Sequence, residues 1–286
     1  MTAAEAYGRC RAITRTEARN FYYGFVFLPP ERRAGIYAMY AFSRRADDSV
    51  DGDEPLEDKL RAVADRRAEL AACYAGTPPP DDPVLVAVAD AVRRFTIPRE
   101  HLEALLDGVE MDLTERRYAD FDALKRYCDR VAGAVGLVSL HVFGFRDPAA
   151  PAHAADLGVA LQIVNIMRDV AEDAGRDRIY LPADEMAAHG VGEDDVLAGR
   201  ATRGFRALMR DQAVRARAYF ASGERLLPLL DRRARMCVAV MAGLYREILD
   251  GIEAEGYDVF DRRVSVSPGR KLVLMGDTML ASLTAR

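Results

Sequence analysis

Apolar side chains recur every three or four positions along most of this chain, and strict alternation is rare. This spacing is the period of an amphipathic α-helix. Breaks rich in proline, glycine and aspartate, such as "LPPE" and "AGTPPPDDP", interrupt the pattern. The sequence therefore predicts an all-α protein with helices over residues 31–50, 56–74, 83–95, 99–114, 120–144, 151–174, 204–227 and 231–255.

Two segments, 131–145 and 156–167, are apolar on nearly every side, which predicts central helices. The first is also rich in small residues: Gly133, Ala134, Gly136 and Ser139. Small side chains allow a neighbouring helix to pack closely, and they also leave room for a long ligand. The sequence leaves both interpretations open.

The chain has 286 residues, of which half are apolar, so it can bury a sizeable core. The proline-rich break near residue 79 reads as a loop within a domain, because neither side of it looks self-sufficient. We expect one domain over residues 1–286, with the last ~20 residues as a peripheral tail. A net charge of −5 from 45 acidic and 40 basic residues leaves no field of one sign, which argues against nucleic acid as a partner.

The cysteines and the longest apolar stretch bear on the compartment. Cys10, Cys73, Cys128 and Cys237 lie far apart without metal-ligand spacing, and we expect buried free thiols in a reducing compartment. The N-terminus lacks an apolar signal-peptide core, and the longest nearly uncharged stretch is shorter than the ~20 residues that span a bilayer. We expect a cytoplasmic protein. Peripheral contact with the inner face of the membrane stays open, as does the oligomeric state.

The stretch "RADDSVDGDE", residues 45–54, concentrates acidic side chains at the end of a tyrosine-rich helical segment. Asp47 and Asp51 are four residues apart and would repel each other on one helical face. Tyr37, Tyr40 and Arg44 extend that face toward the N-terminus. A solvated helix end is the plain alternative.

A second stripe crosses the apolar segment "LQIVNIMRDVAEDAG". Gln162, Asn165, Asp169 and Asp173 follow the spacing i, i+3, i+7 and i+11. A buried amide or carboxylate without partners costs about 1–3 kcal/mol, so this stripe needs partners. The structural alternative is that the amides bond a neighbouring helix while Asp169 and Asp173 pair with Arg168 and Arg176.

Both stripes place an arginine beside two aspartates, which suggests a single site. If the two helices face each other, four carboxylates converge and need cations between them. Oxygen ligands suit Mg²⁺, which bridges carboxylates to phosphate, and arginine binds phosphate oxygens. In a helical cavity this combination predicts ionisation of an allylic diphosphate.

The chain resembles the squalene/phytoene synthase family, the head-to-head prenyl synthases, over almost its whole length. The motifs that carry the resemblance are "ARNFYYG", "YAFSRRADDSVD", "YCDRVAGAVG", "QIVNIMRDVAED" followed by "GRDRIYLP", and "YREILDGIEAEGYDVFDRRVSV". Their order and spacing together are highly specific. The resemblance implies an all-α isoprenoid-synthase bundle around a deep central cavity.

The resemblance also implies roles for individual residues. The Mg²⁺ ligands would be Asp47, Asp48, Asp51, Asn165, Asp169 and Asp173. The residues that bind diphosphate or line the reaction centre would be Arg19, Arg44, Gln162, Asn165, Arg168 and Arg263, the last preferred over Arg262. The aromatic residues that face substrates and stabilise cations through their rings would be Phe21, Tyr40, Tyr127 and Tyr245. Asp129 and Arg130 depart from the aromatic or uncharged residues of some relatives, which leaves the second half-reaction open.

The implied reaction joins two identical prenyl diphosphates and releases diphosphate. The wording of the motifs looks most like bacterial presqualene diphosphate synthases of hopanoid pathways, which use two farnesyl diphosphates. The alternatives are a phytoene synthase acting on two geranylgeranyl diphosphates and a full squalene synthase. No nicotinamide is expected for the first half-reaction, since no G-x-G-x-x-G follows a strand. A terpene cyclase, a head-to-tail prenyltransferase and a non-catalytic helical protein are the alternatives from other classes.

Overall fold

The computed structural model describes residues 1–18 and 21–284, and this part of the chain is helical and contains no strand. A single parallel bridge joins Arg117 and Ile179. The α-helices are α1 Ala3–Glu17, α2 Tyr22–Phe25, α3 Pro30–Asp48, α4 Leu56–Ala75, α5 Pro83–Arg94, α6 Arg99–Thr114, α7 Phe121–Cys128, α8 Ala134–Phe143, α9 Ala150–Gly175, α10 Ala183–Ala188, α11 Glu193–Leu197, α12 Arg203–Gly223, α13 Arg232–Ala254 and α14 Pro268–Thr284. The prediction of an all-α protein is confirmed.

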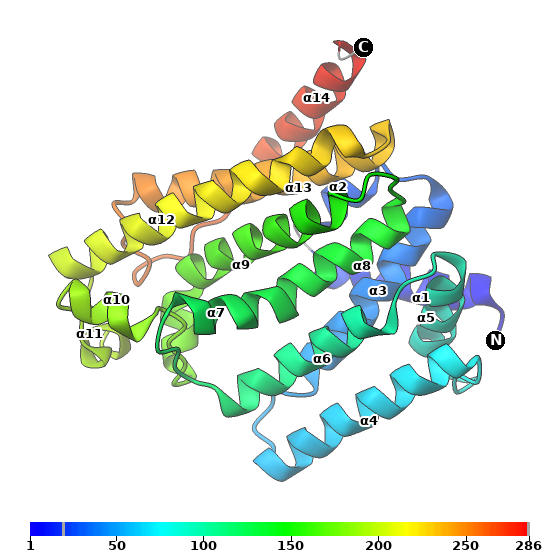
Figure 1. Cartoon of the computed structure of the whole chain (residues 1–286), viewed down its shortest axis with the longest axis horizontal. Helices are drawn as coiled ribbons and strands as arrows, with labels where there is room; N and C mark the ends of the chain where they lie inside the picture. Colours follow the sequence, from blue (N-terminus) through cyan, green and yellow to red (C-terminus); the bar gives the residue numbers. More distant parts are fainter. Residues whose placement is uncertain (19–20, 285–286) are drawn as a thin grey trace.

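Helices α4, α6, α8, α9 and α12 cross the molecule as a row of rods, and α14 leaves the body at one edge (Figure 1). Helix α9 contacts α8, α12 and α13, and eleven of its side chains are buried. Helix α8 lies between α9 and α6 and is also largely buried. The predicted central helices are therefore confirmed.

Side-chain caps fix where several helices begin. Asp82 accepts hydrogen bonds from the backbone N–H groups of Val84 and Leu85, at 2.9 and 3.1 Å, and so starts α5. Asp120, Thr202 and Asp231 cap α7, α12 and α13 in the same way. These caps satisfy amides that would otherwise lack partners at the helix ends.

The small residues near position 136 bring helices close together. A Cβ atom on Gly136 would lie 2.4 Å from the carbonyl oxygen of Ala154 on α9, and one on Gly158 would lie 2.4 Å from that of Ala132. Only glycine allows this approach of two backbones. Gly136 and Gly158 also line the central cavity, so close packing and room for a ligand are both present.

Two predicted helices differ from the observed ones. The predicted helix 120–144 is interrupted by a π-helical segment at Asp129–Gly133, which turns Val131 and Ala132 toward the cavity. The predicted helix 204–227 ends as an α-helix at Gly223 and continues as a 3₁₀ segment, Glu224–Leu229, that contains Pro228. Proline lacks the N–H needed to continue an α-helix.

The four cysteines are buried and unpaired, as expected. Burial raises the pKa of Cys10 and of Cys73 to about 12, so both remain thiols near neutral pH. Within the described ranges, every helix is too short or too polar to cross a bilayer.

Candidate active site

A cavity of about 300 Å³ lies between α2, α3, α6, α8, α9 and α13. Its walls are mainly apolar, with Leu, Val, Phe and Met side chains from all of these helices. Polar side chains gather where α3 and α9 line it: Tyr40, Ser43, Asp47, Gln162 and Asn165. The cavity is thus apolar except at one polar end, and this arrangement suits a long amphiphilic ligand.

The first acidic motif lies at the end of α3. Arg44 Nη2 pairs with Asp48 Oδ1 at 2.6 Å, while Asp47 points into the cavity. Helix α3 ends at Asp48, so Asp51 lies in the following turn and the predicted helical face does not reach it. Arg44 keeps a buried Nε–H without a partner, which leaves an open donor beside the carboxylates.

The second motif occupies the C-terminal half of α9. Gln162 and Asn165 line the cavity, and Asp169 lies beyond them in contact with two arginines. Arg168 donates from Nε and Nη2 to the two oxygens of Asp169 at 2.8 and 2.5 Å, and Arg263 Nε donates to Oδ1 at 2.8 Å. Burial alone would raise the pKa of Asp169, but the hydrogen bonds and charges of these two arginines lower it.

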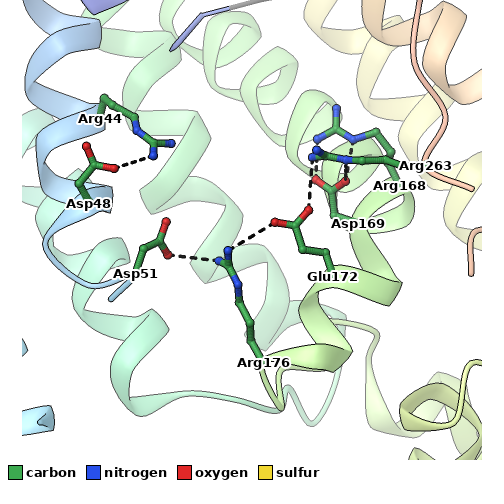
Figure 2. Close-up of polar contacts among 8 residues, drawn as sticks. All are labelled: Arg44, Asp48, Asp51, Arg168, Asp169, Glu172, Arg176 and Arg263. Atoms are coloured by element: carbon green, nitrogen blue, oxygen red, sulfur yellow. Dashed lines mark hydrogen bonds and ion pairs between the residues drawn. The ribbon is translucent and has the colours of Figure 1, made fainter. Parts of the chain in front are cut away.

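The two motifs face each other across a cleft that Arg176 spans (Figure 2). Arg176 contacts Asp51 at 3.3 Å and Glu172 at 3.4 Å. Glu172 is also within 3.7 Å of Arg263. The structural alternative from the sequence is therefore observed for Asp169 with Arg168, whereas Arg176 pairs with Asp51 and Glu172 instead of Asp173.

Asp47 and Asp173 differ from Asp169 because they have no ion pair among the described residues. Surrounding protein raises the pKa of Asp47 to about 7, helped by the nearby charges of Asp112 and Asp51. Burial and the charge of Asp169 raise the pKa of Asp173 to about 7. Asp47 is accessible to water on one side, and protein crowds its other sides.

The donor atoms at this end of the cavity are suited to a hard cation. Asn165 Oδ1 is buried and accepts no hydrogen bond, and the Asp47 and Asp173 carboxylates lack a cationic partner in the described part of the chain. In this conformation no three Asp, Glu, His or Cys side chains of residues 1–18 and 21–284 converge on one point. Arginines hold several of the carboxylates instead. Open amide and carboxylate oxygens are the ligands that Mg²⁺ prefers, so the residues fit this ion once the arginines change partners.

The four aromatic candidates occupy two different settings. Phe21 and Tyr40 line the cavity. Tyr245 is buried behind Phe21, with ring centroids 5.7 Å apart, and Tyr127 is buried outside the cavity wall. Arg19 lies outside the described residues, so its predicted phosphate contact stays a prediction.

The choice between two neighbouring arginines agrees with the geometry. Arg263 reaches Asp169, whereas Arg262 pairs with Glu255 and is 75% exposed. Asp129 and Arg130, which differ from the residues of some relatives, do not line the cavity. Asp129 binds Lys125 and Arg130 lies near Asp107.

A polar cluster that was not predicted lies behind the aspartates. Asp112 on α6 accepts hydrogen bonds from Tyr180 Oη at 2.7 Å and Tyr127 Oη at 3.2 Å. Burial raises the pKa of Asp112, although the two tyrosines and the nearby Arg178 counteract it. Arg178 is half-buried and has no ion pair in the described structure.

A signal for Asp112 was present in the sequence. Asp112 lies seven residues after Leu105, which lines the cavity, so both occupy one face of α6. An acidic residue that continues an apolar stripe is the pattern that revealed the α9 motif. Arg178 had no such signal, because it follows the end of α9 in an irregular segment.

Histidines are absent from the cavity wall among the described residues. The rings of His101 and His141 pack against each other with centroids 5.7 Å apart and planes tilted by 44°, and burial lowers the pKa of both. His189 pairs with Asp211 at 2.9 Å. These contacts give the three histidines structural surroundings away from the cavity.

Comparisons with known proteins identify the family. The family profile described as "Squalene/phytoene synthase" matches residues 14–270. The chain is 42% identical to a phytoene synthase from Mycobacterium bovis, covering 98% of this chain and 92% of the relative. It is 39% identical to a 15-cis-phytoene synthase from Synechococcus elongatus, covering 97% and 93% of the two chains.

Solved structures agree with this similarity. A dehydrosqualene synthase solved in complex with a ligand superposes with a TM-score of 0.90 at 29% identity, covering 98% of this chain and 97% of the other. The squalene synthase HpnC from Alicyclobacillus acidocaldarius superposes with a TM-score of 0.84 at 29% identity, covering 90% and 96%. The fold is therefore the all-α isoprenoid-synthase fold. Within that class, the chain belongs to the squalene/phytoene synthase family, whose members condense prenyl diphosphates head to head.

Proposed function

We propose that this protein joins two identical prenyl diphosphates into a cyclopropyl diphosphate and releases diphosphate, with Mg²⁺ as cofactor. One observation carries the proposal: an apolar cavity ends between two helices that present aspartates and arginines to each other. The apolar part suits the prenyl chains, and the charged end suits the diphosphate groups. When bound, Mg²⁺ would neutralise the departing diphosphate.

The arginines of the two motifs would hold the diphosphates. Arg44 has an open Nε donor, and Arg168 and Arg263 already converge on one carboxylate, so all three can turn toward phosphate oxygens. The oxygen donors for Mg²⁺ would be Asp47, Asp48, Asp51, Asn165, Asp169 and Asp173.

The cavity walls would protect the allylic cation that remains after ionisation. Phe21 and Tyr40 expose their rings to the cavity, and ring faces attract cations. The surrounding leucine, valine and methionine side chains exclude water, which suppresses hydrolysis of the cation.

Loss of a proton closes the cyclopropane ring. No histidine among the described residues lines the cavity, and the released diphosphate lies close to the reacting carbons in this scheme. We assign the role of base to that diphosphate. Transfer of hydride in a second half-reaction forms no part of the proposal.

Two substrate lengths have comparable support. The sequence motifs favour two C15 farnesyl diphosphates and therefore presqualene diphosphate, and the similar solved structures are a dehydrosqualene and a squalene synthase. The similar sequences at 42 and 39% identity are named phytoene synthases, which favours two C20 geranylgeranyl diphosphates. The proposed reaction therefore includes both substrate lengths.

A product assay tests the proposal. Purified protein with Mg²⁺ receives farnesyl diphosphate, geranylgeranyl diphosphate or an equal mixture, without a nicotinamide, and the dephosphorylated products are identified by mass spectrometry. A C30 cyclopropyl alcohol indicates the C15 substrate, and a C40 product indicates the C20 substrate. Asp47→Ala with Asp169→Ala should abolish either product, while exposed Asp65→Ala on α4 should preserve it.

The same assay can overturn the proposal. Cyclic or linear products that keep the carbon count of one substrate would indicate a terpene cyclase. No conversion of either substrate by a folded wild-type protein would favour the non-catalytic alternative.

A further inference from the structure

Helix α14 is attached to the bundle along one side only. It contacts α13 and α2, and its half-buried side chains Leu274, Met275 and Thr278 face that way. Figure 1 shows it at the edge of the molecule, with its C-terminal end directed away from the other helices. The opposite side of α14 therefore faces solvent.

This outward side is almost entirely apolar. The exposed fractions are 48–63% for its five large apolar residues, which are Leu272, Val273, Met279, Leu280 and Leu283. At 100° per residue they fall within an arc of about 120°. They make up half of the ten exposed large apolar side chains found among the described residues, and the other five are spread over five different parts of the chain. A contiguous patch of this kind marks an interaction surface.

Two arginines border the patch. Arg232 and Arg233, at the start of α13, form a groove with Met279, Val26 and Phe27. Both arginines are exposed and have no ion pair among the described residues, and Arg232 contacts Ser282 of α14 at 3.4 Å. Val26 is itself 37% exposed on the same side. The surface thus combines an apolar stripe with two arginines that form no ion pair in the described part of the chain.

We propose that α14 docks this protein onto an anionic lipid surface, with the stripe buried among acyl chains and Arg232 and Arg233 next to lipid phosphates. The apolar arc beside cations is the composition of helices that lie in a membrane interface. Its inner side packs on α13 and α2, so only the outer side is free to enter the lipid and the helix lies along the surface.

Charge favours lipid over a second copy of the chain. A symmetric dimer through this patch would pack the same surface on itself. In such a dimer neither copy's patch would offer a carboxylate to these arginines, because the residues of the patch and its groove are apolar or basic. An anionic surface compensates these charges instead.

Docking would also orient the active site. Residues 264–267 alone connect Arg263, which binds Asp169, to the start of α14. Helices α2 and α13, on which α14 packs, contribute Phe25, Val238 and Met241 to the cavity wall. The lipid surface therefore lies on the other side of one cavity wall, where amphiphilic substrates partition.

Vesicle sedimentation tests the docking without any need for catalysis. The full chain is mixed with vesicles of phosphatidylcholine alone or of equal parts phosphatidylcholine and phosphatidylglycerol. We expect binding to the anionic vesicles. Leu272→Ser with Leu280→Ser should lower the partition coefficient about tenfold or more. Arg232→Gln with Arg233→Gln should lower it about fivefold for each arginine removed, and added salt should weaken the wild type.

The control variant carries Leu56→Ser and Val214→Ser, which replace equally exposed apolar residues on α4 and α12. It should bind like the wild type. Circular dichroism melting of every variant excludes unfolding as the cause of lost binding.

Three results would overturn the proposal. These are no binding of wild type to anionic vesicles, unchanged binding of the Leu272→Ser, Leu280→Ser variant, and equal loss in the control variant. Light scattering measures whether the protein is a dimer. If the wild type is a dimer, the leucine variant is a monomer and neither binds lipid, the patch is the contact with a second copy of the chain. An inactive protein that still docks would separate failure of the proposed reaction from failure of docking.

Discussion

Asp47 and Asp173 are held at raised pKa values in the absence of a cation. Both carboxyls titrate at about pH 7 in the folded protein, against about pH 4 for an aspartate in an unfolded chain. Between these values the folded state binds more protons than the unfolded state, so these two groups make stability fall as pH rises. Their contribution is fully present below about pH 4 and is lost as the pH rises through about 7.

Removing these charges should therefore stabilise the metal-free protein at high pH. We expect Asp47→Asn with Asp173→Asn to raise Tm at about pH 8 by about 2–4 °C over wild type, a modest gain because water screens both sites. At about pH 4 the difference should vanish. Thermal melts in a chelator across this range check it, with exposed Asp65→Asn as the control. If the difference in Tm between wild type and double variant is the same at about pH 4 and about pH 8, the expected titration is wrong.

The carboxylate of Asp112 should matter to the reaction without touching the cavity. It positions Tyr127 and Tyr180 and lies in the field of Asp47 and Asp51. We expect Asp112→Asn to lower kcat about tenfold to hundredfold, because small shifts of positioning groups are costly, with little loss of helicity. The matched change Asp107→Asn, on the same helix but paired with Arg67, should leave kcat within about twofold. Equal effects of the two changes would show that Asp112 has no special role.

Periodicity explains which site residues the sequence could reveal. Gln162, Asn165 and Asp169 stand out because each is polar on an apolar helix, and helical spacing places them on one side. Arg178 lies outside the helices, so no period connects it to the site. Asp51 was selected by its helical spacing from Asp47, although α3 ends at Asp48 and Asp51 reaches the site from the following turn. The arginine partners depend on tertiary packing, as Arg263 and Asp169 are 94 residues apart.

At the scale of elements, helix boundaries followed from breakers and caps. The predicted segments 56–74 and 99–114 agree with α4 and α6 to within a residue. Helix α1 was missed because only three of its residues are buried, so the apolar stripe is weak, although Thr2 and Glu5 form a capping box. Helix α14 was not predicted for a different reason. Apolar residues lie on both its outer and its inner side, so the helical spacing of three or four residues is hard to see in the sequence.

The close packing of α9 against the π-helical segment Asp129–Gly133 depends on glycine. In Gly158→Ala, the new methyl group would meet the backbone of Ala132 and Gly133 at under 3.0 Å, so one helix must shift. We expect a loss of about 1–3 kcal/mol in the free energy of unfolding, measured by urea denaturation. Gly8→Ala on α1, which has open space around it, should gain about 0.5–1 kcal/mol. If both variants are more stable than the wild type, the two backbones do not lie as close together as described.

At the scale of the whole molecule, arginines act as internal counter-ions for the two acidic motifs. Arg44 and Arg168 pair with Asp48 and Asp169 of their own helices, and Arg176 pairs with Asp51 of the other motif. In the proposed reaction, Mg²⁺ alone would have to displace those arginines, and diphosphate alone would draw the arginines away and leave the carboxylates uncompensated. Each ligand would therefore make binding of the other more favourable.

This exchange predicts synergy in ligand binding. Inorganic diphosphate and Mg²⁺ together should raise Tm by more than the sum of their separate effects, because each ligand increases the affinity for the other. A chelator should reverse the increase, and Arg263→Ala should reduce it by at least half, whereas Arg262→Ala should have little effect. Differential scanning fluorimetry provides the measurement. Purely additive shifts would mean that the two ligands bind independently.

Helix α9 carries both the acidic motif and one wall of the cavity, so it fixes the distance between the charged groups and the apolar end of the cavity. Its cavity-lining residues run from Ala154 to Asn165, and eleven residues of helix span about 16 Å. In the proposed reaction Asp169, on the same helix, would fix the diphosphate end of the substrate. The length of chain that fits would then be set at the opposite end, by the side chains of Leu157, Phe143 and Leu226 that line the cavity there. A change in the size of these three side chains would therefore alter the length of hydrocarbon accepted without altering the charged motifs.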